Sequence, residues 1–184
     1  LEKVTYLNLE DNKIKDTYAL GSMVSVEELD IEDNQVTNLV PLCNLENLRW
    51  LDLRDCGIAD IAPLGKLKKV DHLYLDGNLI TNITPLTTLT DLTYLVVENN
   101  KISTLGNLDG LASLNLLSLR GNQIKDISPL KSLKLLTYLN LEGNQISVIR
   151  PLEELTKLQQ LYLSKNQISD LAPLLINAQK GGPG

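Results

Sequence analysis

One residue pattern recurs eight times along this chain, and each copy begins 22 residues after the last. The unit reads LxxLxxLxLxxNxIxxIxPL, and residues 133–152 show it whole. No insertion or deletion disturbs the register, which is marked by Asn12, Asn34, Cys56, Asn78, Asn100, Asn122, Asn144 and Asn166. A fixed period of this length is typical of a solenoid, in which each coil buries its apolar side only against its neighbours.

The letters of the unit predict the shape of one coil. Leu139 and Leu141 alternate with Asn140, which is the period of a half-buried strand. A strand this short needs neighbours, so we expect one parallel strand per coil. Asn144 follows the strand, and its amide is expected to pair with backbone groups of the turn from inside the stack. Pro151 fixes φ and starts a turn on the outer wall.

The pattern is that of the leucine-rich repeat over about residues 1–176. The 22-residue length and the phrase IxPL resemble the internalin group of bacterial surface proteins, and less closely the leucine-rich regulatory subunit of protein phosphatase 1. The resemblance implies an α/β fold: a right-handed leucine-rich repeat solenoid with a concave parallel sheet of about eight short strands and a convex side of short 3-10 or irregular turns. Residues 177–184 are expected to be a flexible tail or linker.

The resemblance also implies a function, the binding of a partner protein. An internalin-like chain would act at the cell surface or in secreted form, whereas a phosphatase-type subunit would act in the cytoplasm. Internalins carry a helical cap before the repeats, and often an immunoglobulin-like domain after them. Neither is visible here, and Leu1 already lies inside a repeat, so we expect the chain to be a piece of a longer protein.

Charge and composition exclude several classes of function. The net charge is -6, which argues against nucleic acid as a partner, because phosphate binding needs surplus Lys and Arg. No run of 18 apolar residues is present, so we expect no membrane insertion. Cys43 and Cys56 fall on opposite walls of the predicted coil and are not expected to form a disulfide. No cofactor is expected, and we expect a monomer.

The variable letters of the strand region carry the functional signal. Equivalent residues of successive coils lie about 4.8 Å apart, so each variable position becomes a column on the concave face. Four such columns hold 32 positions, which include the only Trp, the only His and five of the six Tyr. They also hold 11 of the 23 acidic residues but only 3 of the 17 basic ones. Aromatic and acidic residues are therefore enriched on one predicted face.

We interpret this face as a binding surface for a protein with a basic patch. Tyr and Trp are frequent interface anchors, and clustered carboxylates steer a basic partner. A solubilising sheet face with Tyr chosen for strand propensity is the alternative interpretation. The predicted partner-binding residues are Tyr6, Glu28, Asp30, Glu32, Trp50, Asp52, Arg54, His72, Tyr74, Asp76, Tyr94, Glu98, Arg120, Tyr138, Glu142 and Tyr162.

Catalysis and metal binding are not expected. His72 is the only candidate general base, but an open sheet offers no dry pocket and no nucleophile is in reach. Asp11, Asp33 and Asp55 form a ladder of oxygen ligands that would suit Ca²⁺, and we expect them to be solvated carboxylates instead.

Overall fold

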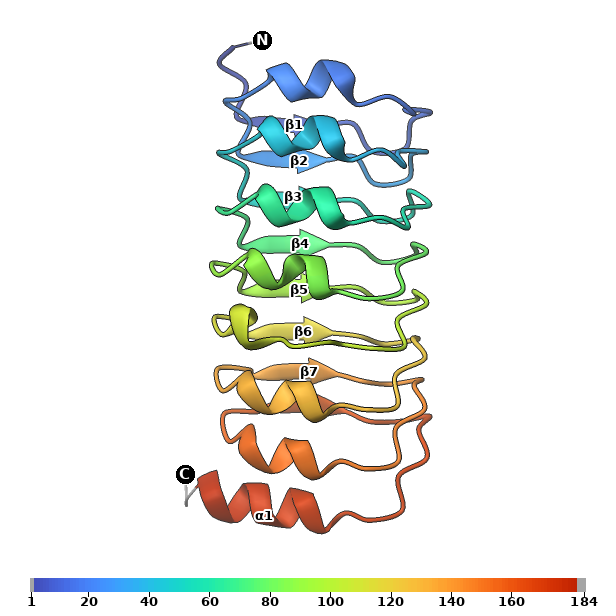
Figure 1. Ribbon diagram of the computed structural model, residues 1–184, viewed down its shortest axis with the longest axis vertical. Coiled ribbons are helices and arrows are strands. Elements are labelled where there is room, and N and C mark those ends of the chain that lie inside the picture. Colours follow the sequence, from blue (N-terminus) through green and yellow to red (C-terminus); the bar gives the residue numbers. More distant parts are fainter. Residues whose placement is uncertain (1, 182–184) are drawn as a thin grey trace.

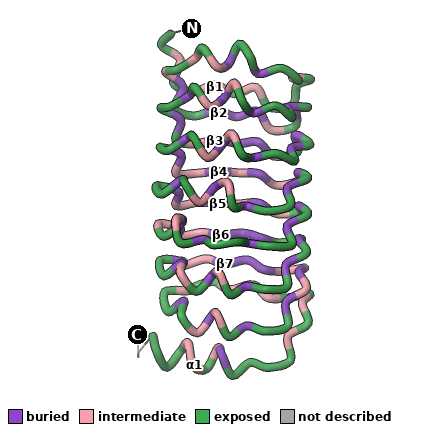
Figure 2. Tube along the Cα trace, viewed as in Figure 1, coloured by how far each residue is buried: buried purple, intermediate pink, exposed green. Residues whose placement is uncertain are grey.

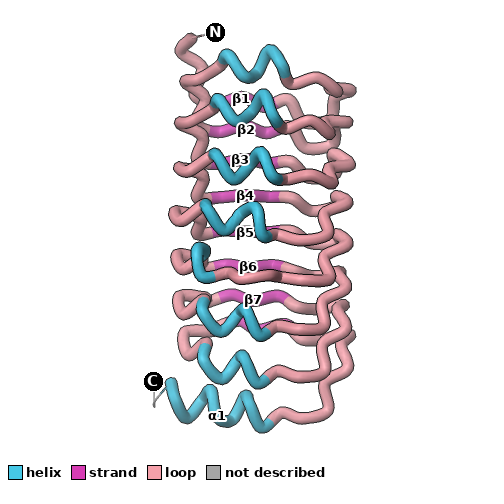
Figure 3. Tube along the Cα trace, in the orientation of Figure 1, coloured by secondary structure: helices cyan, strands magenta, loops and turns pink. Residues whose placement is uncertain are grey.

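The computed structural model describes residues 2–181 as a stack of coils in two layers, a sheet and a row of short helices (Figure 1, Figure 3). The strands are β1 (Tyr6–Asn8), β2 (Glu28–Asp30), β3 (Trp50–Asp52), β4 (His72–Tyr74), β5 (Tyr94–Val96), β6 (Leu116–Ser118), β7 (Tyr138–Asn140) and β8 (Gln160–Tyr162). The 3-10 helices are η1 (Tyr18–Ser22), η2 (Val40–Asn44), η3 (Ala62–Lys66), η4 (Thr84–Thr88), η5 (Asp109–Leu111), η6 (Ser128–Ser132) and η7 (Arg150–Glu154), and an α-helix, α1 (Ala172–Gly181), follows.

The strands form one parallel sheet in sequence order from β1 to β8. Every residue pairs with its equivalent in the next coil, so Leu51 of β3 lies beside Leu29 of β2 and Leu73 of β4. The 22-residue period thus becomes an exact alignment of columns across the sheet. The predicted fold, a leucine-rich repeat solenoid, is confirmed.

The core consists of aliphatic residues that recur from coil to coil, and buried residues are purple along the trace in Figure 2. In the seventh coil Leu139, Leu141, Ile146 and Ile149 are at most 1% exposed, and the equivalent residues of the inner coils are similarly buried. Each coil provides the same small spaces between the layers. Aliphatic side chains fill these spaces closely, which explains why the core contains no Phe.

The asparagines form a hydrogen-bonded ladder inside the stack, as predicted. Asn122 Nδ2 donates to the carbonyls of Val97 (3.0 Å), Leu119 (3.0 Å) and Arg120 (3.3 Å), and its Oδ1 accepts from the Ile102 N–H (3.0 Å). From the second coil on, each ladder asparagine therefore ties its own turn to the coil before it, whereas Asn12 donates only to the carbonyls of Leu9 and Glu10 in its own coil. In the third coil Cys56 replaces the amide, and its thiol donates only to the Ile31 carbonyl at 3.2 Å.

The residue before each of these ladder positions adopts the left-handed backbone conformation. Its φ lies between 51° and 54° where the residue is not glycine, and between 66° and 69° at Gly77, Gly121 and Gly143. Gly, Asn and Asp tolerate this conformation best, and the non-glycine residues here are Asp11, Asp33, Asp55, Asn99 and Lys165. The variable column directly before the ladder positions is thus explained mainly by backbone geometry.

Proline starts the helices of the outer wall in most coils. Pro129 lies in the first turn of η6, and the Asp126 carboxylate accepts from the Ser128 N–H at 2.8 Å to hold the chain entry. Asn107 occupies the proline position in the fifth coil, and there the helix begins later and spans only three residues. The loss of proline alone does not shorten the helix, because η1 keeps five residues with Ala19 in that position.

The helix α1 closes the last coil and packs against η7 (Figure 1). Asn177 Nδ2 donates to the Leu152 carbonyl at 2.6 Å, and Lys180 Nζ lies 2.7 Å from Glu154 Oε1. This arrangement differs from the expected flexible tail at 177–184, because residues 177–181 are helical and bonded to η7; residues 182–184 lie outside the described residues. Within residues 2–181, no helix has the length and apolar character needed to cross a bilayer.

Candidate protein-binding face

All the predicted partner-binding residues lie on one side of the sheet. The middle residue of each strand, such as Leu51, points into the core, so the first and third residues point away from it. The residue two positions after each strand, such as Arg54, shares this side, because Leu53 between them is buried. We call this side, from β1 to β8, the open face.

Two of the predicted residues are buried on this face and are corrected here to supporting roles. Asp52 is 0% exposed and Asp30 is 8% exposed, so neither offers its carboxylate to a partner. Asp52 accepts from the Arg54 N–H (3.1 Å) and from Arg54 Nε (2.9 Å), while Asp30 accepts from the Glu32 N–H (3.1 Å) and Asn8 Nδ2 (3.2 Å). Burial, followed by the neighbouring charges of Asp52 and others, raises the pKa of Asp30.

Arg54 is a cation among the carboxylates at the N-terminal end of the open face, which we call the acidic half: Glu10, Glu28, Asp30, Glu32 and Asp52. Its Nη2 lies 2.6 Å from Asp52 Oδ2 and 2.5 Å from Glu32 Oε2. Its guanidinium carbon also lies 5.8 Å from the centroid of the Tyr74 ring, within cation–π range. Arg54 therefore neutralises part of the acidic half and is itself held in one orientation.

The aromatic residues form three pairs on the open face. The ring centroids are 5.5 Å apart for Trp50 and Tyr74, 4.7 Å for the stacked His72 and Tyr94, and 5.4 Å for Tyr138 and Tyr162. Tyr6, at the first strand, lies outside these pairs and is 58% exposed. The pairs hold the rings as preorganised apolar surface, which lowers the entropy lost when a partner covers them.

Asp71 is a contributor that the column analysis missed. Its Oδ1 lies 2.5 Å from His72 Nδ1, and its Oδ2 lies 4.0 Å from Arg49. Asp71 therefore orients the imidazole that stacks on Tyr94. Only its position next to a column residue could have drawn attention to it in the sequence.

Asp76 and Glu98 are adjacent carboxylates in the middle of the face. Asp76 Oδ1 accepts from the Glu98 N–H at 2.6 Å, and Glu98 Oε1 accepts from Ser118 Oγ at 2.6 Å. Neither carboxylate takes part in an ion pair with any residue of the range 2–181. Burial, opposed by the Glu98 N–H and reinforced by the Glu98 charge, raises the pKa of Asp76 to about 6.

The far end of the face carries its own ion pairs. Lys165 Nζ lies 2.8 Å from Glu142 Oε1, and Arg120 Nη2 lies 4.0 Å from the same oxygen. The hydrogen bond from Lys165 lowers the pKa of Glu142. Glu28, in β2, is exposed and forms no ion pair with the described residues.

The weak calcium candidate is not assembled by the structure. Asp11, Asp33 and Asp55 are exposed at left-handed turns, and they do not form a close ligand group among residues 2–181. The carboxylates that do approach within 4.8 Å of one another are those of Asp30, Glu32 and Asp52. Arg54 is already bonded to two of these three.

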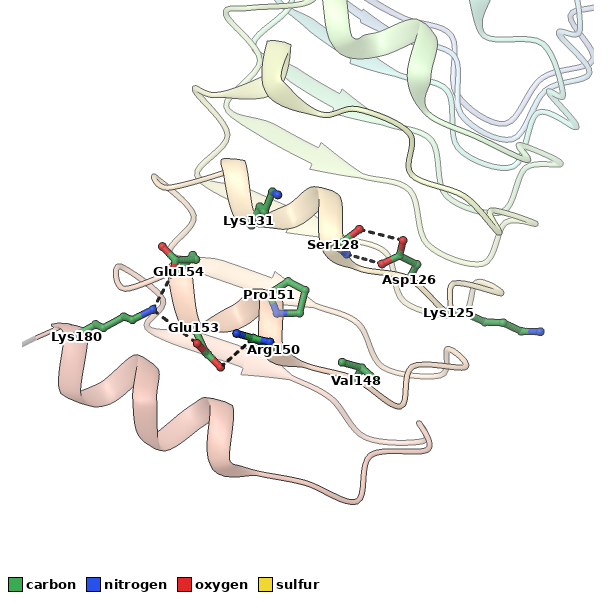
Figure 4. A pocket seen from close by; sticks show the side chains of 10 residues that line it. All are labelled: Lys125, Asp126, Ser128, Lys131, Val148, Arg150, Pro151, Glu153, Glu154 and Lys180. Atoms are coloured by element: carbon green, nitrogen blue, oxygen red, sulfur yellow. Dashed lines mark hydrogen bonds and ion pairs between the residues drawn. The ribbon is translucent and has the colours of Figure 1, made fainter.

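A groove of about 730 Å³ lies on the helix side, between η6, η7 and α1 (Figure 4). Its acidic side chains have partners: Glu154 lies 3.0 Å from Lys134 and 2.7 Å from Lys180, which lower the pKa of Glu154 to about 2. None of the predicted partner-binding residues lines this groove.

The pKa of Asp76 gives a testable dependence of stability on pH. The folded state holds this proton more tightly than the unfolded chain, so its stabilising effect is full below the ordinary value of 3.8 and is lost as the pH rises to about 6. Asp76→Asn keeps the acceptor for the Glu98 N–H and removes the buried charge. We expect it to raise the free energy of unfolding at pH 7.5 by about 1–2 kcal/mol, after discounting for solvent screening, and to change it little at pH 4.

Urea denaturation at the two pH values measures this difference. The control is Glu28→Gln, which removes an exposed acid from the same face and should change the midpoint little at either pH. An equal effect of Asp76→Asn at both pH values would contradict the assignment.

The chain belongs to the leucine-rich repeat family. The family described as "Leucine Rich repeats (2 copies)" matches residues 46–88, 68–112, 90–132, 112–147 and 134–175. A second description, "Leucine Rich repeat", matches residues 1–17. No curated protein sequence matches this chain significantly.

Within this family the chain resembles the internalins. The structure of internalin InlF from Listeria monocytogenes is 31% identical with a TM-score of 0.82, covering 91% of this chain and 56% of that one. Internalin C2 from the same species is 36% identical with a TM-score of 0.68, covering 94% and 67%. The ectodomain of the Arabidopsis thaliana receptor kinase GASSHO1/SCHENGEN3, solved in complex with CASPARIAN STRIP INTEGRITY FACTOR 2, is 30% identical with a TM-score of 0.75, covering 87% and 21%.

Proposed function

We propose that this chain is a protein-binding module of an internalin-like bacterial surface or secreted protein. Its open face binds a partner protein that carries a basic patch. The observation that carries the proposal is the coincidence of three aromatic pairs and an excess of carboxylates on one continuous sheet face. Leucine-rich repeat proteins are protein-interaction modules in general, and the plant ectodomain above was solved in complex with CASPARIAN STRIP INTEGRITY FACTOR 2. The module itself carries out no chemistry in this proposal.

The polarity of the face supports a basic partner. Burial is the main cause that raises the pKa values of Asp30, Glu32 and Asp76, and of these three Asp76 forms no ion pair that would supply a counter-charge among the described residues. A cationic partner would supply that charge and would be steered toward the face as it approaches.

An intracellular scaffold or phosphatase-regulatory subunit is the alternative function. It would use the same face, so the two proposals differ in compartment rather than in site. The identity of 31–36% to internalins over more than 90% of this chain favours the first.

The aromatic pairs give the test of the binding face. We expect Trp50→Ala, Tyr74→Ala and Tyr94→Ala each to weaken binding of the partner by more than about 1 kcal/mol, because each removes one ring of a preorganised pair. The measurement is isothermal titration calorimetry with a partner identified by cross-linking to the intact chain.

The matched control lies on the opposite layer. Tyr18 of η1 is 80% exposed, so Tyr18→Ala removes an equally large ring from the helix side and should leave binding unchanged. Loss of binding on Tyr18→Ala with normal binding by the three face variants would overturn the proposal.

A further inference from the structure

The inference that follows rests on the proposed function and concerns where a basic partner is anchored. Acidic residues are most numerous at the N-terminal end of the open face, and counting alone would place the partner's cation there. The contacts at that end show instead that its carboxylates already have partners within the chain.

The N-terminal carboxylates are largely occupied. Asp52 and Asp30 are buried, and both already accept backbone N–H groups. Glu32 and Asp52 share the guanidinium of Arg54, which lies between them and an incoming cation. A second cation at this position would meet the like charge of Arg54 at close range.

The centre of the face is different. Asp76 and Glu98 touch through the bond from the Glu98 N–H to Asp76 Oδ1, and no cation of the described residues pairs with either. Arg54 is turned toward Asp52 and Glu32, and Arg120 lies nearest to Glu142 at 4.0 Å. Two adjacent, partly buried carboxylates thus lie on the open face without an ion pair, and Arg54 acts on Asp76 only from a distance.

Apolar surface adjoins these carboxylates. Val96 pairs in register with Tyr74 of β4 and with Ser118 of β6, and it is only partly buried. Tyr94, in the same strand, stacks on His72. A long aliphatic side chain that ends in a cation could pack on this apolar surface and place its charged end beside the two carboxylates.

We propose that the partner anchors on the open face through an arginine or lysine side chain that lies over Val96 and places its cationic group against Asp76 and Glu98. The N-terminal acidic half then contributes long-range attraction, while the central pair sets the position of the partner. Charge complementarity selects a basic protein segment as the occupant, since a guanidinium can bridge two adjacent carboxylates.

A hexa-arginine peptide at low ionic strength is the probe, with hexa-glutamate as the control peptide. Titrated into the isotopically labelled chain, hexa-arginine should shift the backbone amide NMR signals of Val96, Glu98 and Ser118 most strongly. The double variant Asp76→Asn/Glu98→Gln should bind the peptide at least about fivefold more weakly. The matched control, Glu10→Gln/Asp11→Asn, removes two exposed acids near β1 that lie outside the predicted partner-binding residues, and it should change affinity by less than about twofold.

The outcomes separate the inference from the function on which it rests. Equal weakening by the two double variants, or the largest shifts at residues 28–32, would overturn the central anchor while leaving the open face as the binding surface. Absence of binding to the sheet, or equal binding of hexa-glutamate, would contradict the proposed function as well. Circular dichroism of each variant verifies that the fold is retained.

Discussion

Asn122→Ala should lower the free energy of unfolding by about 3–5 kcal/mol. The substitution leaves the Ile102 N–H and the Val97 carbonyl without their partner and weakens two further carbonyl bonds, all beside the core. Each buried backbone group that loses its hydrogen bond costs about 1–3 kcal/mol. The shift of the urea midpoint, followed by circular dichroism, measures the loss.

Two variants calibrate this result. Asn122→Cys reproduces the natural substitution at Cys56, whose thiol bonds to one carbonyl, so its loss should be smaller than that of alanine. Gln123→Ala changes an exposed neighbour and should stay within about 0.5 kcal/mol of the parent. If Asn122→Ala unfolds no earlier than Gln123→Ala, the ladder does not hold the coils together.

Arg54→Ala should destabilise the chain by about 2–3 kcal/mol at neutral pH. The substitution leaves the fully buried Asp52 without its counter-charge. Removal of one partner from a buried ion pair typically costs about 3–5 kcal/mol, and the value here is lower because the Arg54 side chain is 36% exposed. The same urea experiment measures it.

The double variant Asp52→Asn/Arg54→Ala tests the cause. Asparagine retains an acceptor for the N–H of residue 54 and needs no cation, so the double variant should recover most of the loss. Additive losses of the two single substitutions would contradict a direct dependence of Asp52 on Arg54.

The repeat allowed the fold to be predicted almost completely. A constant 22-residue period aligns equivalent residues of successive coils, and it therefore predicts the parallel order, the core and the role of the ladder asparagines. The shortened η5 accompanies Asn107 in the place of proline and a left-handed Gly106 before it, whereas η1 keeps five residues with Ala19 in the same place. The helical course of residues 177–181 was missed because a Gly-rich end dominated the interpretation.

The candidate site was harder to predict, because an acidic residue on the face can have either a structural role or a binding role. Asp11 occupies a left-handed turn position, and Asp52 accepts backbone and guanidinium N–H groups, so both have structural reasons to be acidic. A count of acids on one face cannot separate these roles from binding. Rotamers and packing determine which carboxylates Arg54 contacts. It pairs with Asp52 and Glu32, so Asp76 and Glu98 form no ion pair with it.

The asparagine ladder and the open face differ in how well they tolerate substitutions during evolution. Substitution of an exposed residue of the open face that has no structural partner, such as Glu28, changes the surface and leaves the coil beneath it intact, so new specificities are reachable one substitution at a time. A ladder residue is shared between two coils, as Asn122 is with Val97 and Ile102, and its loss is felt by both. Selection can therefore change the partner that the protein binds, while the hydrogen bonds between coils conserve the scaffold.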